Sequence, residues 1–574
     1  ITDHQAGTLI YPSALCCGFV AFTEDFLHMF RSALLGLGLL LATTAVGQTT
    51  VPTQVQTIND EIRQGWKDYQ ISRPAPDARD MEWCRRVYLD VIGRVPSYNE
   101  LMAFDDLRGK DKRAQLVEQL LHDDRYTEEY AAHWATTWTN LLIGQSGGND
   151  RRSMTSRDGL KKYLRDSFAA NKPYDRLVYE LVTAEGATAP GAENFNGAVN
   201  FLVDKVNDEK AVLATSSTSR IFLGQQVQCT QCHNHPFNQW KQQKFWEFNS
   251  FFRQTRALRR FVSGTRDIDH AELVNEDFAG EANDPSDALV YYELRNGLSR
   301  VAYPVFTDGT EIPRSGYVSD VNRRQELGRL MLESEYLDQM IVNRMWSLFL
   351  GYGFTKPIDD LGPHNPQSHP QLLEQLGQEF RNSSYDLKQL ITWITLSEPY
   401  NLSAVLGSYN EIDDPSIGEM PKFSRFYLRQ MTAEQLYQSL VTATDAAAAG
   451  SYEAQETQRR RWLGQFVVAF GTDEGDEATT FNGSIPQALM LFNGELTKKA
   501  TSTAKGSFID RIVAKGEGDG GLSELFLTGL ARRPTANEKK IARQLLIARG
   551  GNHKEALQDM WWAILNSNEF IMQH

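Results

Sequence analysis

Apolar residues recur at three- and four-residue spacing along most of the chain, which is the pattern of amphipathic helices. In the first half this spacing predicts helices over 80–93, 97–107, 111–122, 127–143, 157–170 and 173–184. In the second half it predicts helices over 321–351, 369–381, 386–397, 432–444, 485–497, 523–531, 535–549 and 554–567. The fold class is therefore predicted to be mainly α.

One stretch between these two groups of helices breaks the helical pattern. Two runs rich in β-forming residues, Leu289–Leu294 and Val301–Phe306, flank the pair Asn296-Gly297. An Asn-Gly pair between such runs is a strong signal for a β-hairpin. A small hairpin is therefore expected here.

The length of 574 residues exceeds the size at which a single hydrophobic core keeps growing. Together with the break in the helical pattern, it predicts two multi-helical domains. We expect the first over 56–255 and the second over 321–574, with a variable segment over 256–320 that inserts the β-hairpin between them.

The amino-terminal region has a different character. From Met29 the sequence has a basic start, an apolar stretch over Ala33–Leu41 and small residues up to Gly47. This order is typical of a secretory signal peptide, and the apolar stretch is too short to span a bilayer. Residues 29–47 are therefore predicted to be a signal peptide, and residues 1–28 a non-native upstream extension.

A signal peptide implies that the protein is exported to a periplasmic or extracellular space. The membrane is then an expected partner only through the signal segment, if that segment stays uncleaved. The chain has 59 Lys and Arg against 73 Asp and Glu, a net charge of −14, and no long basic run. This charge argues against a nucleic-acid partner, so the expected partners are extracytoplasmic proteins, including redox proteins.

Cysteine is scarce. Two of the five cysteines, Cys16 and Cys17, fall in the leader, which leaves Cys84, Cys229 and Cys232. Three cysteines in a chain of this length do not form a disulfide framework. Cys84 lies in a helical pattern and is expected to be a buried structural thiol.

The sharpest chemical signature is Cys229-Thr-Gln-Cys232-His233. Cys-x-x-Cys-His is the spacing that attaches c-type haem: the two thiols form thioethers to the haem vinyl groups, and the adjacent imidazole binds iron. The motif predicts haem c, with Cys229 and Cys232 as the tether and His233 as the proximal ligand.

Two other interpretations of this cluster stay open. Cys229, Cys232 and His235 have the spacing of a zinc or other transition-metal site, with His233 or a residue from elsewhere as a further ligand. Alternatively, the two cysteines form a local disulfide or remain thiols, with both histidines hydrogen-bonded and no cofactor. The residues alone do not decide between the three.

A second group of polar residues, Asp359, Asp360, His364 and His369, lies in a turn-rich connection between two helices. Two carboxylates and two histidines could bind a metal or move protons. A structural role is the alternative, because Ser368 is followed three residues later by a Gln, which matches a capping box. We expect this structural role.

Two segments far apart repeat one pattern, a helix, an Arg-x-Pro turn and a new helix. Ser97 precedes Glu100 in one segment, and Thr535 precedes Glu538 in the other. In this spacing the hydroxyl and the carboxylate satisfy each other's free backbone donors at a helix start. The two segments are predicted to be matching structural units.

The chain resembles the planctomycete cytochrome-C-associated protein family. In the first half the matching motifs are Tyr88-Leu-Asp-x-x-Gly-Arg-x-Pro, Leu121-x-x-x-Arg-Tyr126, His133-Trp134 and Phe222 to Phe237 around the cysteines. In the second half they are Asn343-Arg-Met-Trp346, Gly351-Tyr-Gly-Phe354, Asp359-Asp360, Ser368-His-Pro370 and Asn566-Ser-x-Glu-Phe570. The resemblance implies a cytochrome-like amino-terminal domain and a planctomycete-specific carboxy-terminal domain, both of unknown function.

The hypothesis that follows is an exported, c-type cytochrome-like electron-transfer component. The alternative is a non-enzymatic extracytoplasmic binding or scaffold protein with a zinc site or a disulfide at the cysteines. No nucleotide-binding or hydrolase motif is present, so the sequence does not establish an enzymatic reaction. A metal-dependent enzyme would require the Asp359 to His369 segment to meet the cysteine cluster in space.

Overall fold

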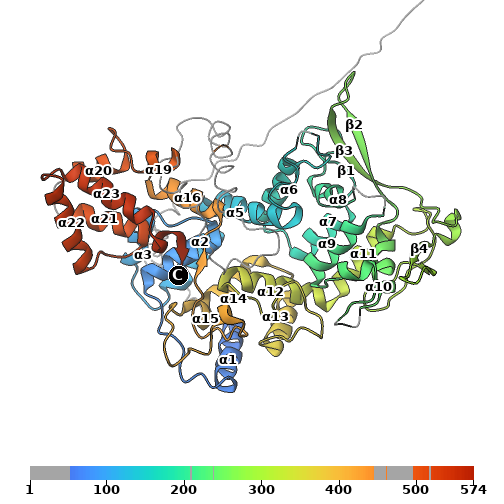
Figure 1. Ribbon diagram of the computed structural model, residues 1–574, viewed down its shortest axis with the longest axis horizontal. Helices are drawn as coiled ribbons and strands as arrows, with labels where there is room; N and C mark the ends of the chain where they lie inside the picture. The colour runs from blue at the N-terminus through green and yellow to red at the C-terminus, as the bar shows by residue number, and fades with distance from the viewer. Residues whose placement is uncertain are drawn as a thin grey trace, which may run out of the picture. The chain divides into compact units, whose positions relative to one another are not determined.

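The computed structural model describes residues 52–574, apart from residue 151, residues 207–209, residues 237 and 239, residues 445–494 with the exception of 461, and residues 516–518. The predicted extension over 1–28, the predicted signal peptide over 29–47 and most of the helix predicted over 485–497 lie outside these residues. The described part is mainly helical, with a few small antiparallel sheets (Figure 1).

The helices of the first half are α1 (Thr53–Asp68), α2 (Asp80–Ile92), α3 (Tyr98–Asp106), α4 (Lys112–His122), α5 (Asp124–Ile143), α6 (Arg157–Ala169), α7 (Tyr174–Thr183), α8 (Asn200–Lys205), α9 (Val212–Leu223) and α10 (Gln242–Asn249). Those of the second half are α11 (Arg323–Glu333), α12 (Glu335–Leu350), α13 (Pro370–Asn382), α14 (Leu387–Leu396), α15 (Glu398–Asn401), α16 (Ala433–Thr444), α19 (Glu495–Ala500), α20 (Phe508–Ala514), α21 (Asp519–Leu530), α22 (Ala536–Ala548), α23 (His553–Leu565) and α24 (Asn568–Ile571). Short 3₁₀ helices are η1 (Gly197–Val199), η2 (Gln228–Gln231), η3 (Ser250–Phe252), η4 (Pro285–Asp287) and η5 (Pro415–Ile417).

The helices predicted for the first half correspond to α2 through α7 within a few residues. Two predictions were wrong in detail. The single helix expected over 321–351 is interrupted at Ser334, whose hydroxyl caps the new helix α12 by accepting a hydrogen bond from the backbone N–H of Tyr336. The Thr- and Gln-rich composition over 48–57 predicts a tether between signal peptide and domain, but α1 already begins within this segment, at Thr53.

Three small sheets accompany the helices. The strands are β1 (Gly186–Ala187), β2 (Thr255–Phe261), β3 (Ile268–Asn275), β4 (Val290–Glu293), β5 (Ser299–Ala302), β6 (Arg429–Gln430) and β7 (Met572–Gln573). β1, β3 and β2 form one antiparallel sheet in that order, while β4 pairs with β5 and β6 with β7. The pairing of β4 with β5 brackets Asn296-Gly297, with Val290 opposite Ala302.

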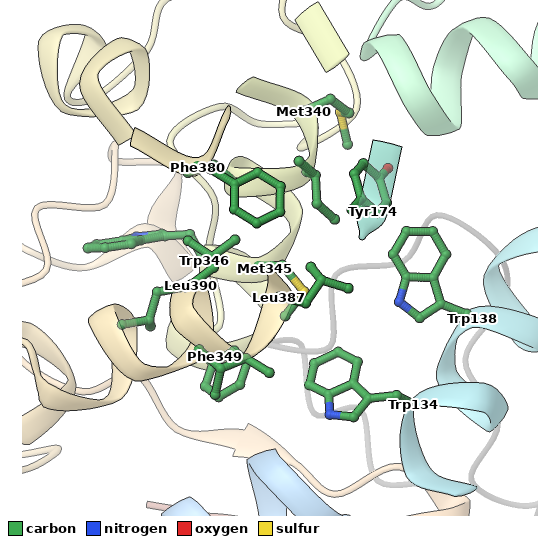
Figure 2. Close-up of a cluster of buried hydrophobic side chains, with 14 of the residues drawn as sticks. Trp134, Trp138, Tyr174, Met340, Met345, Trp346, Phe349, Phe380, Leu387 and Leu390 are labelled. Atoms are coloured by element: carbon green, nitrogen blue, oxygen red, sulfur yellow. The ribbon is translucent and has the colours of Figure 1, made fainter. Parts of the chain in front are cut away.

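The hydrophobic core joins the two halves of the chain. Trp134 on α5 stacks against Phe349 on α12, with ring centroids 6.0 Å apart. Tyr174 on α7 packs against Phe380 on α13 at 6.3 Å. Figure 2 shows these aromatic side chains in one buried cluster with Met340, Met345, Trp346, Leu387 and Leu390. The predicted division into two multi-helical domains therefore does not correspond to two separate cores.

A second cluster of buried apolar side chains lies between α16 and the helices α19 to α24. It also includes Leu89 on α2 and Val95 in the turn that follows. The carboxy-terminal helices are thus anchored on the amino-terminal ones. None of the helices in the described residues is long and apolar enough to cross a membrane.

The two repeated segments form the predicted capping boxes, Ser97 with Glu100 and Thr535 with Glu538. Each box is extended by an arginine that binds two carboxylates. Arg94 binds Glu100 and a second glutamate from α5, and Arg532 binds Glu538 and a second glutamate from α24. The two segments therefore share the same local architecture, a helix start locked by a partly buried ion-pair network.

Candidate functional site

The cysteine cluster lies on the loop between α9 and α10. α9 ends at Gly224, whose left-handed backbone (φ 60°) turns the chain away from the helix. The 3₁₀ helix η2 follows and contains Cys229. Cys229 and Cys232 are both exposed, free thiols, whereas Cys84 is a buried free thiol as predicted. The pair is thus accessible for covalent modification from solvent.

His233 is held in one tautomer by its neighbour. Its Nδ1 lies 2.6 Å from the carbonyl oxygen of Asn234. A carbonyl can only accept a hydrogen bond, so Nδ1 carries the proton and the lone pair of the neutral ring is on Nε2. This is the arrangement that ligating histidines commonly adopt, in which one ring nitrogen donates to the protein and the other binds the metal.

His235 has the opposite arrangement. Its Nδ1 lies 3.1 Å from the backbone N–H of Asn238, which can only donate. The lone pair of the neutral His235 ring is therefore on Nδ1 and the proton on Nε2. Burial, together with the neighbouring His364, lowers the pKa of His235, which favours this neutral form. To bind a metal through Nε2, His235 would have to give up its contact with Asn238.

The turn that carries Asp359, Asp360 and His364 lies directly against this loop. The rings of His235 and His364 are 5.9 Å apart between centroids. His364 donates from Nε2 to the carboxylate of Asp360 at 2.8 Å. This leaves the lone pair on Nδ1 of His364, which is buried and has no hydrogen-bond partner within the part of the chain that the structure describes.

Asp359 fixes the chain just before the cysteines. Its carboxylate accepts a hydrogen bond from Gln226 at 2.8 Å and pairs with Arg220 on α9 at 3.4 Å. The backbone N–H of Leu361 also donates to the carbonyl of Gly224 at 2.8 Å. Residues of both halves therefore build one site, and sequence reasoning missed the roles of Arg220 and Gln226 because neither belongs to a recognisable motif.

Replacing Gly224 by alanine should loosen this junction. A Cβ at this position would lie 2.7 Å from Cγ of Leu361 and 2.8 Å from Sδ of Met340, and the backbone is left-handed. We expect Gly224→Ala to lower the free energy of unfolding by about 1–3 kcal/mol in urea denaturation. Gly550→Ala is the matched control, because Gly550 has the same φ of +60° but open space at its Cβ. Equal losses in both variants would contradict close packing at Gly224.

His369 lies apart from this group. It is buried against Gly65 of α1, against Tyr69 just after that helix, and against the rings of Phe354 and Phe423. His369 itself occupies the N-cap position of α13, and the helix start has no side-chain cap hydrogen bond, so the predicted capping box at Ser368 is wrong. Pro370 occupies the first turn, as expected. His369 attaches α1 to the second half rather than completing the site.

Because of this burial, His369 should make stability depend on pH. Desolvation lowers the pKa of His369 from its ordinary value of 6.5 to about 4. Between these two values the unfolded chain binds the proton and the folded chain does not, so the free energy of unfolding falls as the pH drops from 6.5 towards 4. The fall in the free energy of unfolding that His369 causes approaches about 1.4 kcal/mol for each pH unit in this range.

Urea denaturation at several pH values, compared with His369→Gln, measures this contribution. The variant should show a shallower loss of stability in this pH range. His122→Gln, on the surface of α4, is the control. An unchanged pH dependence in His369→Gln would contradict the assignment.

The helix α10 forms the other wall of the site. Trp246 donates from its indole N–H to the carbonyl of Gln231 at 3.2 Å. Gln242 donates to the same carbonyl at 3.2 Å, and its backbone N–H donates to the side chain of Asn234 at 3.0 Å. These contacts hold the carbonyl of Gln231 and the side chain of Asn234, the residues that flank Cys232 and His233, so α10 supports this loop.

The side chains of this loop can be compared with what a metal site and covalent haem attachment would each require. Within the described residues, no three His, Cys, Asp or Glu side chains are grouped so that they could hold a metal ion. Haem attachment requires only two accessible thiols and one imidazole with a lone pair on Nε2. Cys229, Cys232 and His233 supply these three groups.

Two family models match the chain, one in each half. Residues 57–257 match PSCyt2, a protein of unknown function (DUF1549). Residues 323–465 match PSD1, a protein of unknown function (DUF1553). The chain is therefore similar to both of these domain families. This agrees with the planctomycete domains that the motifs resembled, while the description of PSCyt2 states no cytochrome function.

Neither a curated protein nor a solved structure matches the chain. The PSCyt2 segment contains the cysteines, His233 and His235, and the PSD1 segment contains Asp359, Asp360 and His364. The contact between His235 and His364 therefore joins the PSCyt2 segment to the PSD1 segment. The candidate site belongs to the pair of domains rather than to either one.

Proposed function

We propose that this protein is an exported, c-type cytochrome-like electron-transfer component. The observation that carries the proposal is the orientation of His233 beside two exposed, free thiols. Its Nδ1 is engaged by a carbonyl, so its Nε2 lone pair is available to a metal. Cys229 and Cys232 would hold the haem through thioethers, and His233 would be its proximal ligand.

The haem iron would supply one-electron chemistry. The protein's own residues orient this ligand and support the loop. Asn234 fixes the tautomer of His233, and the hydrogen bonds of Gln242 and Trp246 to the Gln231 carbonyl hold the chain around Cys232. Asp359 holds the segment before Cys229 from the other half of the chain.

The alternative, a scaffold protein with a zinc site made by Cys229, Cys232 and His235, receives less support. His235 accepts a backbone N–H at Nδ1, so its Nε2 carries a proton in the neutral ring. The hypothesis of a metal-dependent enzyme gains one observation, because Asp360 and His364 do lie beside the cysteine loop. His369 takes no part in it, since it is buried elsewhere.

Export belongs to the same proposal. It is supported by the basic start, short apolar stretch and small residues over 29–47. Secretion would place the two thiols where covalent haem attachment or a redox partner can reach them, in a periplasmic or extracellular space.

The test distinguishes which of the two neighbouring histidines, His233 or His235, is the haem ligand. His233→Ala and His235→Ala are each expressed with export and a c-type haem maturation system, and their visible spectra are compared with that of the parent chain. His233→Ala should change the haem absorbance bands or lose haem, because its proximal ligand is gone. His235→Ala should keep the parent spectrum. The reverse pattern would rule out His233 as the ligand.

A further inference from the structure

Two histidines from different halves of the chain lie close together beside the cysteine loop. His235 belongs to the loop and His364 to the turn between α12 and α13, and their ring centroids are 5.9 Å apart. A zinc–nitrogen bond of about 2.0–2.1 Å places the centre of each imidazole about 3.2 Å from the ion, so two imidazoles on one ion have centres up to about 6.4 Å apart. The separation of the two rings falls within this limit, so both can bind one metal ion.

His364 has the hydrogen-bonding arrangement of a metal ligand. Its Nε2 donates to the carboxylate of Asp360 at 2.8 Å, and its buried Nδ1 has no hydrogen-bond partner among the residues that the structure describes. Ligating histidines commonly donate their other ring nitrogen to a carboxylate, which fixes the ring and makes the ligand more basic. A buried polar atom without a partner calls for an explanation, and a metal ion at Nδ1 supplies one.

The chain leaves room beside this nitrogen. A Cβ at Gly362 would lie 2.5 Å from Nδ1 of His364 and 3.3 Å from Oδ1 of Asp360. This position is only slightly farther from the nitrogen than the length of a metal–nitrogen bond. Because glycine has no Cβ, the space next to Nδ1 stays open.

Hydrogen bonds fix the turn against the loop before any ion binds. The backbone N–H of Leu361 donates to the carbonyl of Gly224 at 2.8 Å, which attaches the turn to the end of α9. The side chain of Asn365 donates to the carbonyl of Asp360 at 2.8 Å, which closes the turn around the carboxylate. Ligands that are held in place by such contacts bind a metal more tightly than mobile ones.

Metal binding would cost one contact of His235. Its Nδ1 accepts a hydrogen bond from the backbone N–H of Asn238 at 3.1 Å. Coordination through Nδ1 displaces this N–H, and coordination through Nε2 requires the ring proton to move to Nδ1, so either mode breaks the hydrogen bond. The net contribution of one neutral hydrogen bond is small, and the ion gains two nitrogen ligands in exchange.

We propose that His235 and His364 bind a divalent transition-metal ion such as Zn²⁺ or Cu²⁺, with Asp360 orienting His364. Imidazole is a preferred ligand of these ions. Water completes the coordination, which leaves positions of the kind at which a metal ion activates water or a substrate. The PSCyt2 segment supplies one ligand and the PSD1 segment the other. The site is separate from the proposed haem and does not depend on it.

Zn²⁺ binding is measured by isothermal titration calorimetry on a full chain without reactive thiols. This background carries Cys16→Ser, Cys17→Ser, Cys229→Ser and Cys232→Ser, while Cys84 is buried. Covalent haem and a zinc site made by the cysteines are both impossible in it. One Zn²⁺ should still bind, and an excess of Mg²⁺ should not compete, because Mg²⁺ prefers oxygen ligands.

Four variants of this background test the geometry. His235→Ala and His364→Ala should each weaken Zn²⁺ binding by about a hundredfold or more, because each removes a ligand. Asp360→Asn keeps both ligands but removes the charge behind His364, and it should weaken binding by about tenfold to a hundredfold. Gly362→Ala should also weaken binding, because its methyl group takes the space beside Nδ1.

The matched controls are His270→Ala and Asp269→Asn. These two residues form a histidine–aspartate pair on β3, with Nδ1 of His270 2.7 Å from the carboxylate of Asp269. Both controls should bind Zn²⁺ as the serine background does. They separate the loss of a specific site from the general loss of one histidine or one carboxylate.

Zn²⁺ binding that persists unchanged in His235→Ala or His364→Ala would overturn the inference. Binding by the parent chain that is absent from the serine background would assign the ion to the cysteines and would overturn it as well, as would no binding in either chain. Haem attachment is measured on the parent chain with its cysteines, so the two proposals can fail separately.

Discussion

Trp346→Ala is expected to lower the free energy of unfolding by about 3–5 kcal/mol, because it removes a large side chain from the centre of the core that joins the two halves. Trp346 is fully buried and stacks on Phe354 with centroids 4.6 Å apart. It also meets Phe423 edge to face at 5.3 Å. Urea denaturation followed by circular dichroism measures the loss.

The matched control is Trp562→Ala on α23, where the indole is 40% exposed. This variant should lose about 1 kcal/mol or less, because partly exposed side chains leave smaller cavities. Two separate unfolding transitions in the parent chain, with only one moved by Trp346→Ala, would contradict a core shared by both halves.

Asp90→Ala should cost a similar amount, about 3–5 kcal/mol, because it leaves a buried charge without its partner. Asp90 on α2 is buried, pairs with Arg429 on β6 and accepts a hydrogen bond from Tyr400 on α15 at 2.7 Å. Removing the carboxylate leaves the buried guanidinium of Arg429 without this partner. The loss is measured by the same urea denaturation.

The double variant Asp90→Ala with Arg429→Met tests this explanation. A buried pair replaced by apolar residues often costs little, so the double variant should recover a large part of the loss seen in Asp90→Ala. Strictly additive losses in the double variant would show that the ion pair is not what connects α2 to β6.

The helical pattern predicted much of the fold because the helices of this chain are amphipathic and carry ordinary capping residues. The capping boxes at Ser97 and Thr535 are local interactions, which spacing alone specifies. The hairpin β2–β3 was missed, because Arg256, Arg259 and Arg260 occupy β2 and conceal the alternation of a strand. The break at Ser334 was missed because apolar spacing continues across it.

Only those parts of the site that are made of residues close together in the sequence could be predicted. Cys-x-x-Cys-His is read directly from consecutive residues, and so is the pair Asp359-Asp360. The meeting of His235 with His364 depends on how α9 and α12 pack, which no local pattern encodes. His369 was grouped with the second cluster because of its nearness in sequence, although α1 buries it in another part of the core.

The measurement that tests the central claim most directly is the intact mass and visible spectrum of the exported protein, produced together with a c-type haem maturation system. The account predicts a haem absorbance band and a covalent increase in mass, both lost in the variant Cys229→Ala with Cys232→Ala and both retained in Cys84→Ala. A colourless protein at its unmodified mass would contradict the account.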